Sequence, residues 1–191
     1  KQWKIYEENL AAIQLKRATV ELNKPRYIGM CILDISKIVM YRFHYDFMMK
    51  KYPGTKLLFT DTDSFCYNIP TETDIYSDIR DNDWFDFSNY SKDHPNYNTN
   101  HKLVPGKFKD EMGGKPIEEF IGLRSKMYSI LESSGMTKKT GKGILTVVKD
   151  KEITHKKYKD TLFGKKQMRH KMTKIMQKDH EMYTAEIMKT S

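Results

Sequence analysis

Long hydrophobic runs are missing from this sequence. No apolar stretch approaches the roughly 20 residues that span a bilayer, and the opening residues Lys1-Gln2-Trp3-Lys4 lack the apolar run of a secretory signal. Cysteine is also scarce, because only Cys31 and Cys66 are present, far apart and without metal-ligand spacing. We expect two buried thiols in a reducing, intracellular compartment, with a disulfide between them as the alternative.

The apolar content is nevertheless sufficient for a core. Hydrophobic residues make up 38% of the 191 positions and aromatic residues 12%, which argues against wholesale disorder. This length suits one ordinary domain or two small ones that share an edge.

The positive charge is concentrated near the end of the chain. Residues 1–132 carry 19 lysines and arginines and 19 acidic residues, whereas residues 133–191 carry 15 and 6, so the whole excess of +9 lies in the last third. Such a segment is typical of a surface that binds nucleic acid. The alternative is a solvated, lysine-rich face.

Hydrophobic periodicity predicts an α+β fold. We expect the apolar stripe of Ile32–Tyr52 to form a helix that ends at Pro53-Gly54, and alternating apolar residues to form strands. In the first half of the chain, the other predicted segments are two strands in Leu10–Leu22, a hairpin in Leu57–Ile69, a short capped helix in Thr71–Arg80 and an irregular insert in Asn82–Lys102. Strands are then predicted in Gly106–Glu111 and Ile117–Leu131, with a turn at Gly113-Gly114 between them. They are followed by a linker in Ser133–Gly143, a strand in Ile144–Val148 and a helix with a methionine stripe in Lys165–Lys178.

Two carboxylates mark the tip of the predicted hairpin. Asp61 and Asp63 stand two residues apart between short, β-favouring segments, so an extended backbone would direct both side chains to one side. Carboxylates this close repel each other unless a cation lies between them. Mg²⁺ favours such oxygen ligands, and a two-metal site can promote phosphoryl transfer. A bare Asp-x-Asp turn is more often only a solvated hairpin.

The surrounding residues strengthen the functional hypothesis. The run Asp61-Thr62-Asp63-Ser64 between apolar strands closely resembles motif C of family B DNA polymerases, a palm hairpin that holds catalytic metals. Downstream, Lys126-Met127-Tyr128 resembles the Lys-x-Tyr motif of that family, which contacts the primer end. Lys142-Gly143-Ile144 matches a Lys-Gly-apolar step that follows this motif in many members.

Flanking blocks narrow the resemblance to one branch of that family. The segments Ile32–Lys37, Met40–Tyr45 and Gly106–Glu111, together with Lys24-Pro25, resemble polymerases of self-synthesising DNA transposons of the Maverick/Polinton type and of related viral and linear-plasmid elements. The similarity runs from about residue 8 to about residue 189. It implies a DNA-directed DNA polymerase with a priming protein as a partner, located in the nucleus or at a viral replication site if the source is eukaryotic.

Several family motifs have no counterpart in the sequence. The sequence lacks motif B, which binds the nucleotide, and the exonuclease motifs. It also lacks motif A, which carries a further metal-binding aspartate, because Asp34 and Asp46 lie within a helical stripe. We therefore expect a C-terminal piece of a polymerase, inactive alone. The alternatives are a non-catalytic DNA-binding module derived from such an enzyme and a structural remnant without a DNA role.

The resemblance assigns roles to particular residues. It implies that Asp61 and Asp63 supply part of a two-Mg²⁺ shell, that primer-template DNA and deoxynucleoside triphosphates are partners, and that no membrane is involved. It places a palm portion with an antiparallel sheet and a packed helix in residues 1–132 and a small basic thumb in residues 133–191. The residues expected to contact DNA are Arg124, Lys126, Tyr128, Lys138, Lys139 and Lys142; Arg124 alone could instead pair with an acid such as Glu118.

Overall fold

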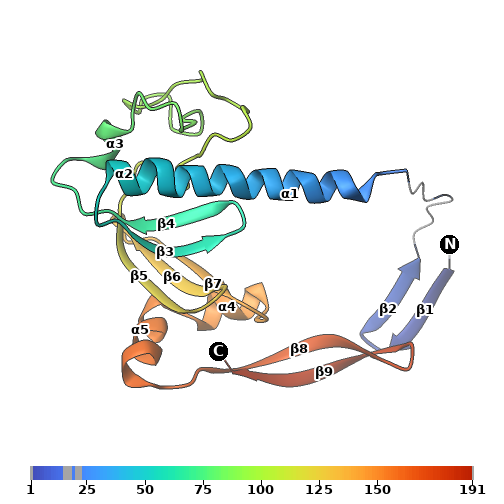
Figure 1. Cartoon of the computed structure of the whole chain (residues 1–191). Coiled ribbons are helices and arrows are strands. Elements are labelled where there is room, and N and C mark those ends of the chain that lie inside the picture. Colours follow the sequence, from blue (N-terminus) through green and yellow to red (C-terminus); the bar gives the residue numbers. More distant parts are fainter. Residues whose placement is uncertain (1, 15–18, 20–22, 191) are drawn as a thin grey trace. The chain divides into compact units, whose positions relative to one another are not determined.

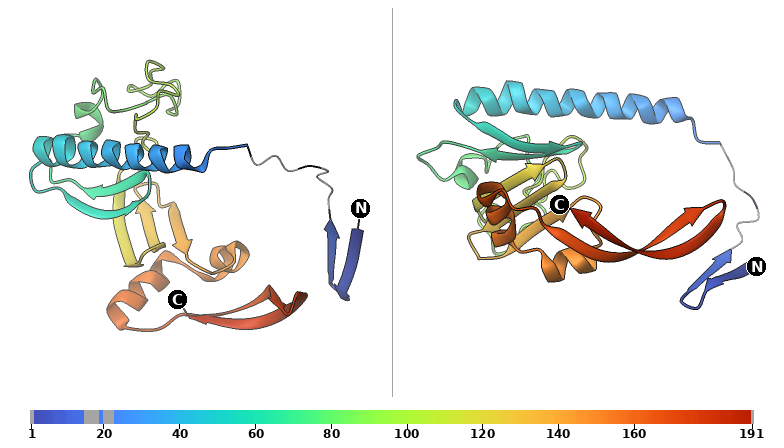
Figure 2. Two further views of the ribbon diagram at one scale, coloured as in Figure 1. Left: turned by 45° about the vertical axis from the view of Figure 1, so that its right-hand side comes forward. Right: turned by 90° about the horizontal axis from the view of Figure 1, so that it is seen from below.

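The computed structural model, drawn in Figures 1 and 2, describes residues 2–14, 19 and 23–190. The chain divides into two compact units. The first unit comprises Lys1–Lys24, Ile121–Ile130 and Thr137–Ser191, and the second comprises Pro25–Phe120 and Leu131–Met136. Helices are combined with small antiparallel sheets, so the predicted α+β class is confirmed. No described helix is both long enough and apolar enough to cross a bilayer.

A long helix opens the second unit. It runs through α1 (Arg26–Tyr41), the π-helical segment η1 (Arg42–Met48) and α2 (Met49–Lys51). The predicted helix was correct in its end but wrong in its start, because the α-helix already begins after Pro25, a residue that is tolerated where the first backbone N–H groups lack partners.

The apolar stripe of this helix is buried only in its second half. Ile32 and Ile35 expose 60% of their surface, whereas Phe43 exposes 4%, so only part of the predicted stripe faces a core. Phe43 stacks on Phe108 with ring centroids 4.1 Å apart and on Phe65 with centroids 6.0 Å apart. The core of the second unit is therefore an aromatic cluster centred on the η1 segment.

The exposed half of α1 also carries Cys31. This thiol is exposed while Cys66 is buried, and both are free. The expectation of two buried thiols was therefore wrong for Cys31, and the alternative of a disulfide does not apply. Burial raises the pKa of Cys66 to about 11, so its thiol stays protonated at neutral pH.

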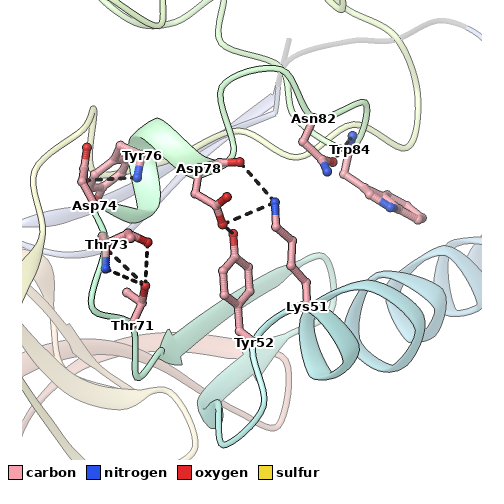
Figure 3. A network of polar contacts seen from close by, with 9 residues as sticks. All are labelled: Lys51, Tyr52, Thr71, Thr73, Asp74, Tyr76, Asp78, Asn82 and Trp84. Carbon is pink, nitrogen blue, oxygen red and sulfur yellow. Dashed lines mark hydrogen bonds and ion pairs between the residues drawn. The ribbon is translucent and has the colours of Figure 1, made fainter.

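Polar contacts fasten the end of the long helix to the short helix α3 (Ile75–Asp78), as Figure 3 shows. The Tyr52 hydroxyl donates to the Asp78 carboxylate, and the Lys51 ammonium lies 3.3 Å from the same carboxylate. Asp74 caps α3 by accepting from backbone N–H groups of its first turn. The capped helix was predicted correctly, although it is shorter than Thr71–Arg80.

The irregular insert of the second unit lies between α3 and the next strand. No described residue of Asn82–Lys102 forms a strand or an α-helix, as predicted, and both Gly113 and Gly114 have positive φ at the predicted turn. The strand expected in Gly106–Glu111 was wrong, because only one isolated bridge, Phe85 with Phe108, forms there. This segment is held by backbone hydrogen bonds of Phe108 with Trp84 and Asp86 and by the packing of the Phe108 ring, without a regular strand.

A three-stranded sheet follows, with the order β5-β6-β7. The strands are β5 (Ile117–Arg124), β6 (Met127–Glu132) and β7 (Thr137–Gly141), and β5 and β6 contribute residues to both units. Strand structure in Ile117–Leu131 was predicted. The expected linker was wrong for Thr137–Gly141, because this polar segment is recruited as the third strand.

Two expectations for the last third were also wrong. Residues in Ile144–Val148 do not form a strand; instead α4 (Thr146–Glu152) begins there, followed by α5 (His155–Gly164). The predicted helix in Lys165–Lys178 is the strand β8 (Arg169–Lys178), which pairs along its whole length with β9 (Glu181–Thr190). Pairing with the following strand overrode the helical spacing of the methionines.

A second hairpin of the first unit lies at the start of the chain. β1 (Gln2–Glu7) pairs with β2 (Leu10–Gln14), and Lys4 of β1 forms an exposed ion pair of 2.6 Å with Glu181 of β9. The first strand predicted in Leu10–Leu22 is thus confirmed as β2. The second, around Val20 and Leu22, lies outside the described residues.

Candidate functional site: a carboxylate hairpin and two lysine turns

The predicted carboxylates lie at the tip of a hairpin in the second unit. β3 (Lys56–Asp61) pairs with β4 (Ser64–Asn68), and Asp61 is opposite Ser64 in the register. Only Thr62 and Asp63 remain between the strands. The hairpin predicted from the apolar flanks is therefore confirmed, with Asp61 half-buried and Asp63 exposed.

The turn at this tip is unusually tight. The backbone N–H of Asp63 donates to the carbonyl oxygen of Asp61 at 2.7 Å, and Thr62 between them has a φ of 61°. This combination is that of a γ-turn with a positive central φ, which is rare and strained. A β-branched residue is particularly disfavoured at positive φ, and such strain concentrates at binding and catalytic sites.

Hydroxyl groups support the Asp61 side of the turn. The Ser64 hydroxyl lies 3.3 Å from the Asp61 carbonyl oxygen, and the Thr62 hydroxyl lies 3.4 Å from an Asp61 carboxylate oxygen. The sequence Asp-Thr-Asp-Ser thus supplies both the carboxylates and two hydroxyl groups that contact Asp61. The tip presents two acidic residues on a short, constrained segment.

The hairpin offers at most two carboxylates to a metal ion. Across residues 2–14, 19 and 23–190, no three histidine, cysteine, aspartate or glutamate side chains are gathered closely enough to hold one. Mg²⁺ is commonly held by one or two carboxylates together with substrate phosphates and water. Asp61 and Asp63 fit the protein share of such a site.

The strands around the hairpin are packed within the second unit. Phe59 of β3 stacks on Phe120 of β5, with ring centroids 5.6 Å apart, and Cys66 of β4 is buried. Behind β4, the Nδ1 atom of His44 lies 2.9 Å from the Tyr67 hydroxyl. The π-helical segment places His44 there, a pairing that no pattern in the sequence indicated.

The predicted DNA contacts belong to the first unit, around the turn between β5 and β6. Arg124 ends β5 and Lys126 lies in the turn with a φ of 56°, both exposed. Tyr128 is half-buried on β6 and follows Met127, which exposes 1% of its surface. The buried Met127 anchors the motif Lys126-Met127-Tyr128 at the sheet. Glu118, the proposed alternative partner of Arg124, forms no ion pair with it among the described residues.

A second tight turn follows β7. The N–H of Ile144 donates to the carbonyl oxygen of Gly141 at 3.1 Å, and Gly143 between them has a φ of 80°. Glycine is required here because few residues tolerate this φ. Lys142 therefore occupies the outer corner of a β-turn, with an exposed side chain.

The two turns lie side by side. The backbone N–H of Lys142 donates to the carbonyl oxygen of Lys126 at 3.0 Å. Two of the predicted DNA contacts, which are distant in the sequence, are thereby brought together. Because Asp61 and Asp63 lie in the other unit, the two groups of predicted residues are separate structural features.

The remaining predicted lysines lie on β7. Lys138 is exposed, whereas Lys139 is half-buried and its ammonium donates to the Ile153 carbonyl oxygen at 2.6 Å. This bond ties β7 to the segment between α4 and α5, which gives Lys139 a structural role in the first unit. The buried Tyr158 hydroxyl reinforces the same junction by donating to the Thr140 carbonyl oxygen at 2.5 Å.

One lysine near these turns was not predicted. Lys189 is on β9, and its Cε atom lies 3.3 Å from the position that a Cβ on Gly143 would occupy. Its place results from the pairing of β8 with β9, which the sequence spacing did not indicate.

Searches against models of protein families, curated proteins and solved structures found no match for this chain.

Proposed function

We propose that this chain is the palm and thumb portion of a family B DNA polymerase, which transfers nucleotides to a primer 3′-hydroxyl. This proposal rests mainly on the strained γ-turn that presents Asp61 and Asp63 at a hairpin tip. The sequence resemblance to motif C supplies the identity of the reaction. A purely solvated hairpin would have no need to hold a threonine at positive φ between two like charges.

Within this proposal, Asp61 and Asp63 would hold Mg²⁺ together with a carboxylate from motif A. When bound, the metal ions stabilise the attacking and leaving oxygens of nucleotidyl transfer. The role of the chain's own residues is to hold two acidic groups at the end of a rigid hairpin, so that little reorganisation is needed.

The first unit would hold the duplex through its phosphates. Its turns carry Lys126 and Lys142 as neighbours, and lysine is a point charge suited to phosphate rather than to reading bases. Arg124, Tyr128 and Lys138 would extend this surface. Binding would therefore be independent of sequence and strongly dependent on salt.

A second candidate is a non-catalytic DNA-binding module derived from such a polymerase. It is favoured by the lack of a third metal-binding side chain beside Asp61 and Asp63 in the described residues. This candidate predicts duplex binding without any dependence of function on the two carboxylates. Primer extension by the complete polymerase that contains this chain distinguishes the two proposals.

In that assay, Asp61→Asn or Asp63→Asn should lower the extension rate about 10³-fold or more, since metal stabilisation of a transition state is worth several kcal/mol. The matched control is Asp46→Asn, which removes an exposed carboxylate of the same unit that pairs only with Lys50. Equal rates for all three variants and the unaltered enzyme would refute a catalytic role for the hairpin.

A further inference from the structure

The two lysine turns of the first unit are the β5–β6 turn, which holds Lys126, and the Gly141–Ile144 turn, which holds Lys142. At Gly143 the backbone of the second turn has no side chain of its own to cover it. This glycine has a φ of 80°, and a Cβ there would lie 3.3 Å from Cε and 3.7 Å from Nζ of Lys189. The Lys189 side chain thus lies directly over the space that a side chain at 143 would fill. A ligand that reaches this ammonium also reaches the backbone of the turn.

Three lysines from separate segments lie near this glycine, of which Lys189 is placed there by its side chain and Lys126 and Lys142 by their backbones. Lys142 precedes Gly143, Lys126 is joined to Lys142 by a backbone hydrogen bond of 3.0 Å, and Lys189 approaches from β9. Among the described residues, Lys142 and Lys189 have no ion-pair partner. Lysines without an ion-pair partner leave their positive charge uncompensated, which raises the local potential and attracts an anion.

Both turns are rigid, which suits a fixed binding site. Lys126 has a φ of 56° in a two-residue turn, and the Gly141–Ile144 turn is closed by its own hydrogen bond. Lys189 is held by the register of β9, where it pairs with the buried His170 of β8. Because the backbone of all three lysines is constrained, binding would order mainly their side chains.

We propose that Lys189, together with Lys142 and Lys126, binds one backbone phosphate of duplex DNA over Gly143. The inference deepens the proposed function, because it rests on DNA being the partner of the first unit. It adds Lys189 as a phosphate contact and gives Gly143 a reason beyond its turn, since any side chain there would displace Lys189. The ligand is a phosphodiester, and free phosphate is the alternative source of the same chemistry.

The first arm of the test is a salt titration of duplex binding by the whole chain. Lys189→Gln should reduce the steepness of log affinity against log salt by about 1, because one phosphate is no longer neutralised. The matched control is Lys178→Gln, an exposed lysine at the other end of the same hairpin, which should leave the slope unchanged. Lys189→Arg keeps the charge and should restore the slope.

The second arm uses the unaltered chain and distinguishes the two phosphate sources. The amide signal of Gly143 in an NMR titration should shift with duplex DNA but not with inorganic phosphate at the same ionic strength. A shift with phosphate alone would overturn the assignment to nucleic acid. This measurement decides the question even if Lys189→Gln fails to fold.

The outcomes separate this inference from the proposed function. Duplex binding by the unaltered chain with equal slopes for Lys189→Gln and Lys178→Gln would overturn the phosphate site alone. A lack of duplex binding would overturn the site and the DNA-holding role of the first unit together. The catalytic proposal would then still stand or fall on the extension rates of Asp61→Asn and Asp63→Asn.

Discussion

The backbone N–H of Asp63 donates to the carbonyl oxygen of Asp61 across Thr62, at 2.7 Å. This bond holds two acidic residues at the end of a hairpin whose strands are fixed by the core of the second unit. Asp63 is the more exposed of the two and projects from the turn itself. Its carboxylate therefore adds like charge to the tip while making little contact with the fold.

Asp63→Asn should leave the isolated chain as stable as before or slightly more stable, because one of two neighbouring negative charges is removed. The melting temperature should be equal or higher by up to about 2 °C. Asp78→Asn is the control, since Asp78 accepts from Tyr52 and pairs with Lys51, and its loss should lower the melting temperature. A clear drop for Asp63→Asn would assign that carboxylate a structural role.

Tyr52→Phe should destabilise the chain in a pH-dependent way. The hydrogen bond from the Tyr52 hydroxyl lowers the pKa of Asp78, and Lys51 lowers that pKa further. The stability that Asp78 contributes to the fold is therefore present above its unfolded pKa of about 4. It is lost as the pH falls through the still lower folded pKa. We expect Tyr52→Phe to lower the free energy of unfolding by about 1 kcal/mol at pH 7. This is less than is usual for a hydrogen bond to a charged group, because Asp78 is partly exposed to solvent.

Thermal melts of both proteins from pH 7 to pH 2 measure this difference. The gap between them should narrow below pH 4 as Asp78 becomes protonated in either protein. Burial and the bond to Asp78 also raise the pKa of Tyr52, so no narrowing is expected between pH 5 and pH 9. A gap that is constant down to pH 2 would show that the hydroxyl acts by packing alone.

The two cysteines should differ sharply in reactivity. Cys31 is exposed on α1, whereas Cys66 is buried on β4 with a pKa raised to about 11 by burial. The thiolate is the reactive form, so at pH 8 a thiol reagent should label one site per folded chain. Cys31→Ser should abolish this labelling, while Cys66→Ser should leave it unchanged. Two labelled thiols in the folded protein would contradict the burial of β4.

Local patterns predicted the hairpin with Asp61 and Asp63, because apolar flanks and an acidic turn are encoded within a few adjacent residues. The same holds for the end of the long helix at Pro53. Strand structure in Ile117–Leu131 was also predicted, but the turn that divides it into β5 and β6 was not. The roles of β7 and β8 could not be predicted in this way. Thr137–Gly141 is polar and the methionines of Arg169–Lys178 have helical spacing, yet both segments form strands because each pairs with a neighbouring strand across a short turn.

The candidate site shows the same division. Lys126 and Lys142 were predicted separately, but their adjacency depends on a hydrogen bond between two turns. Lys189 was not predicted, since its position follows from the register of β9. The exposed first half of α1 contradicts an expectation based on periodicity alone, because an apolar stripe specifies a face and not what covers it.

The concentration of positive charge in residues 133–191 should determine how the chain binds duplex DNA. Replacing Lys156, Lys165 and Lys166 by glutamine removes three exposed charges from the first unit without touching the lysine turns. Replacing Lys92, Lys102 and Lys115 removes three exposed charges from the second unit. Both triple variants change the net charge equally, so they separate local contact from the field of the whole protein.

A salt titration of duplex binding measures the two sets. If the first set contacts phosphates, the slope of log affinity against log salt becomes shallower by roughly 0.9 for each phosphate that is no longer neutralised, up to about 3 in total. The second set should leave the slope unchanged and lower affinity only slightly, through long-range attraction that salt screens. Equal slopes for the two variants would mean that Lys156, Lys165 and Lys166 form a solvated face, and the phosphate contacts of the first unit would then have to be sought at its lysine turns.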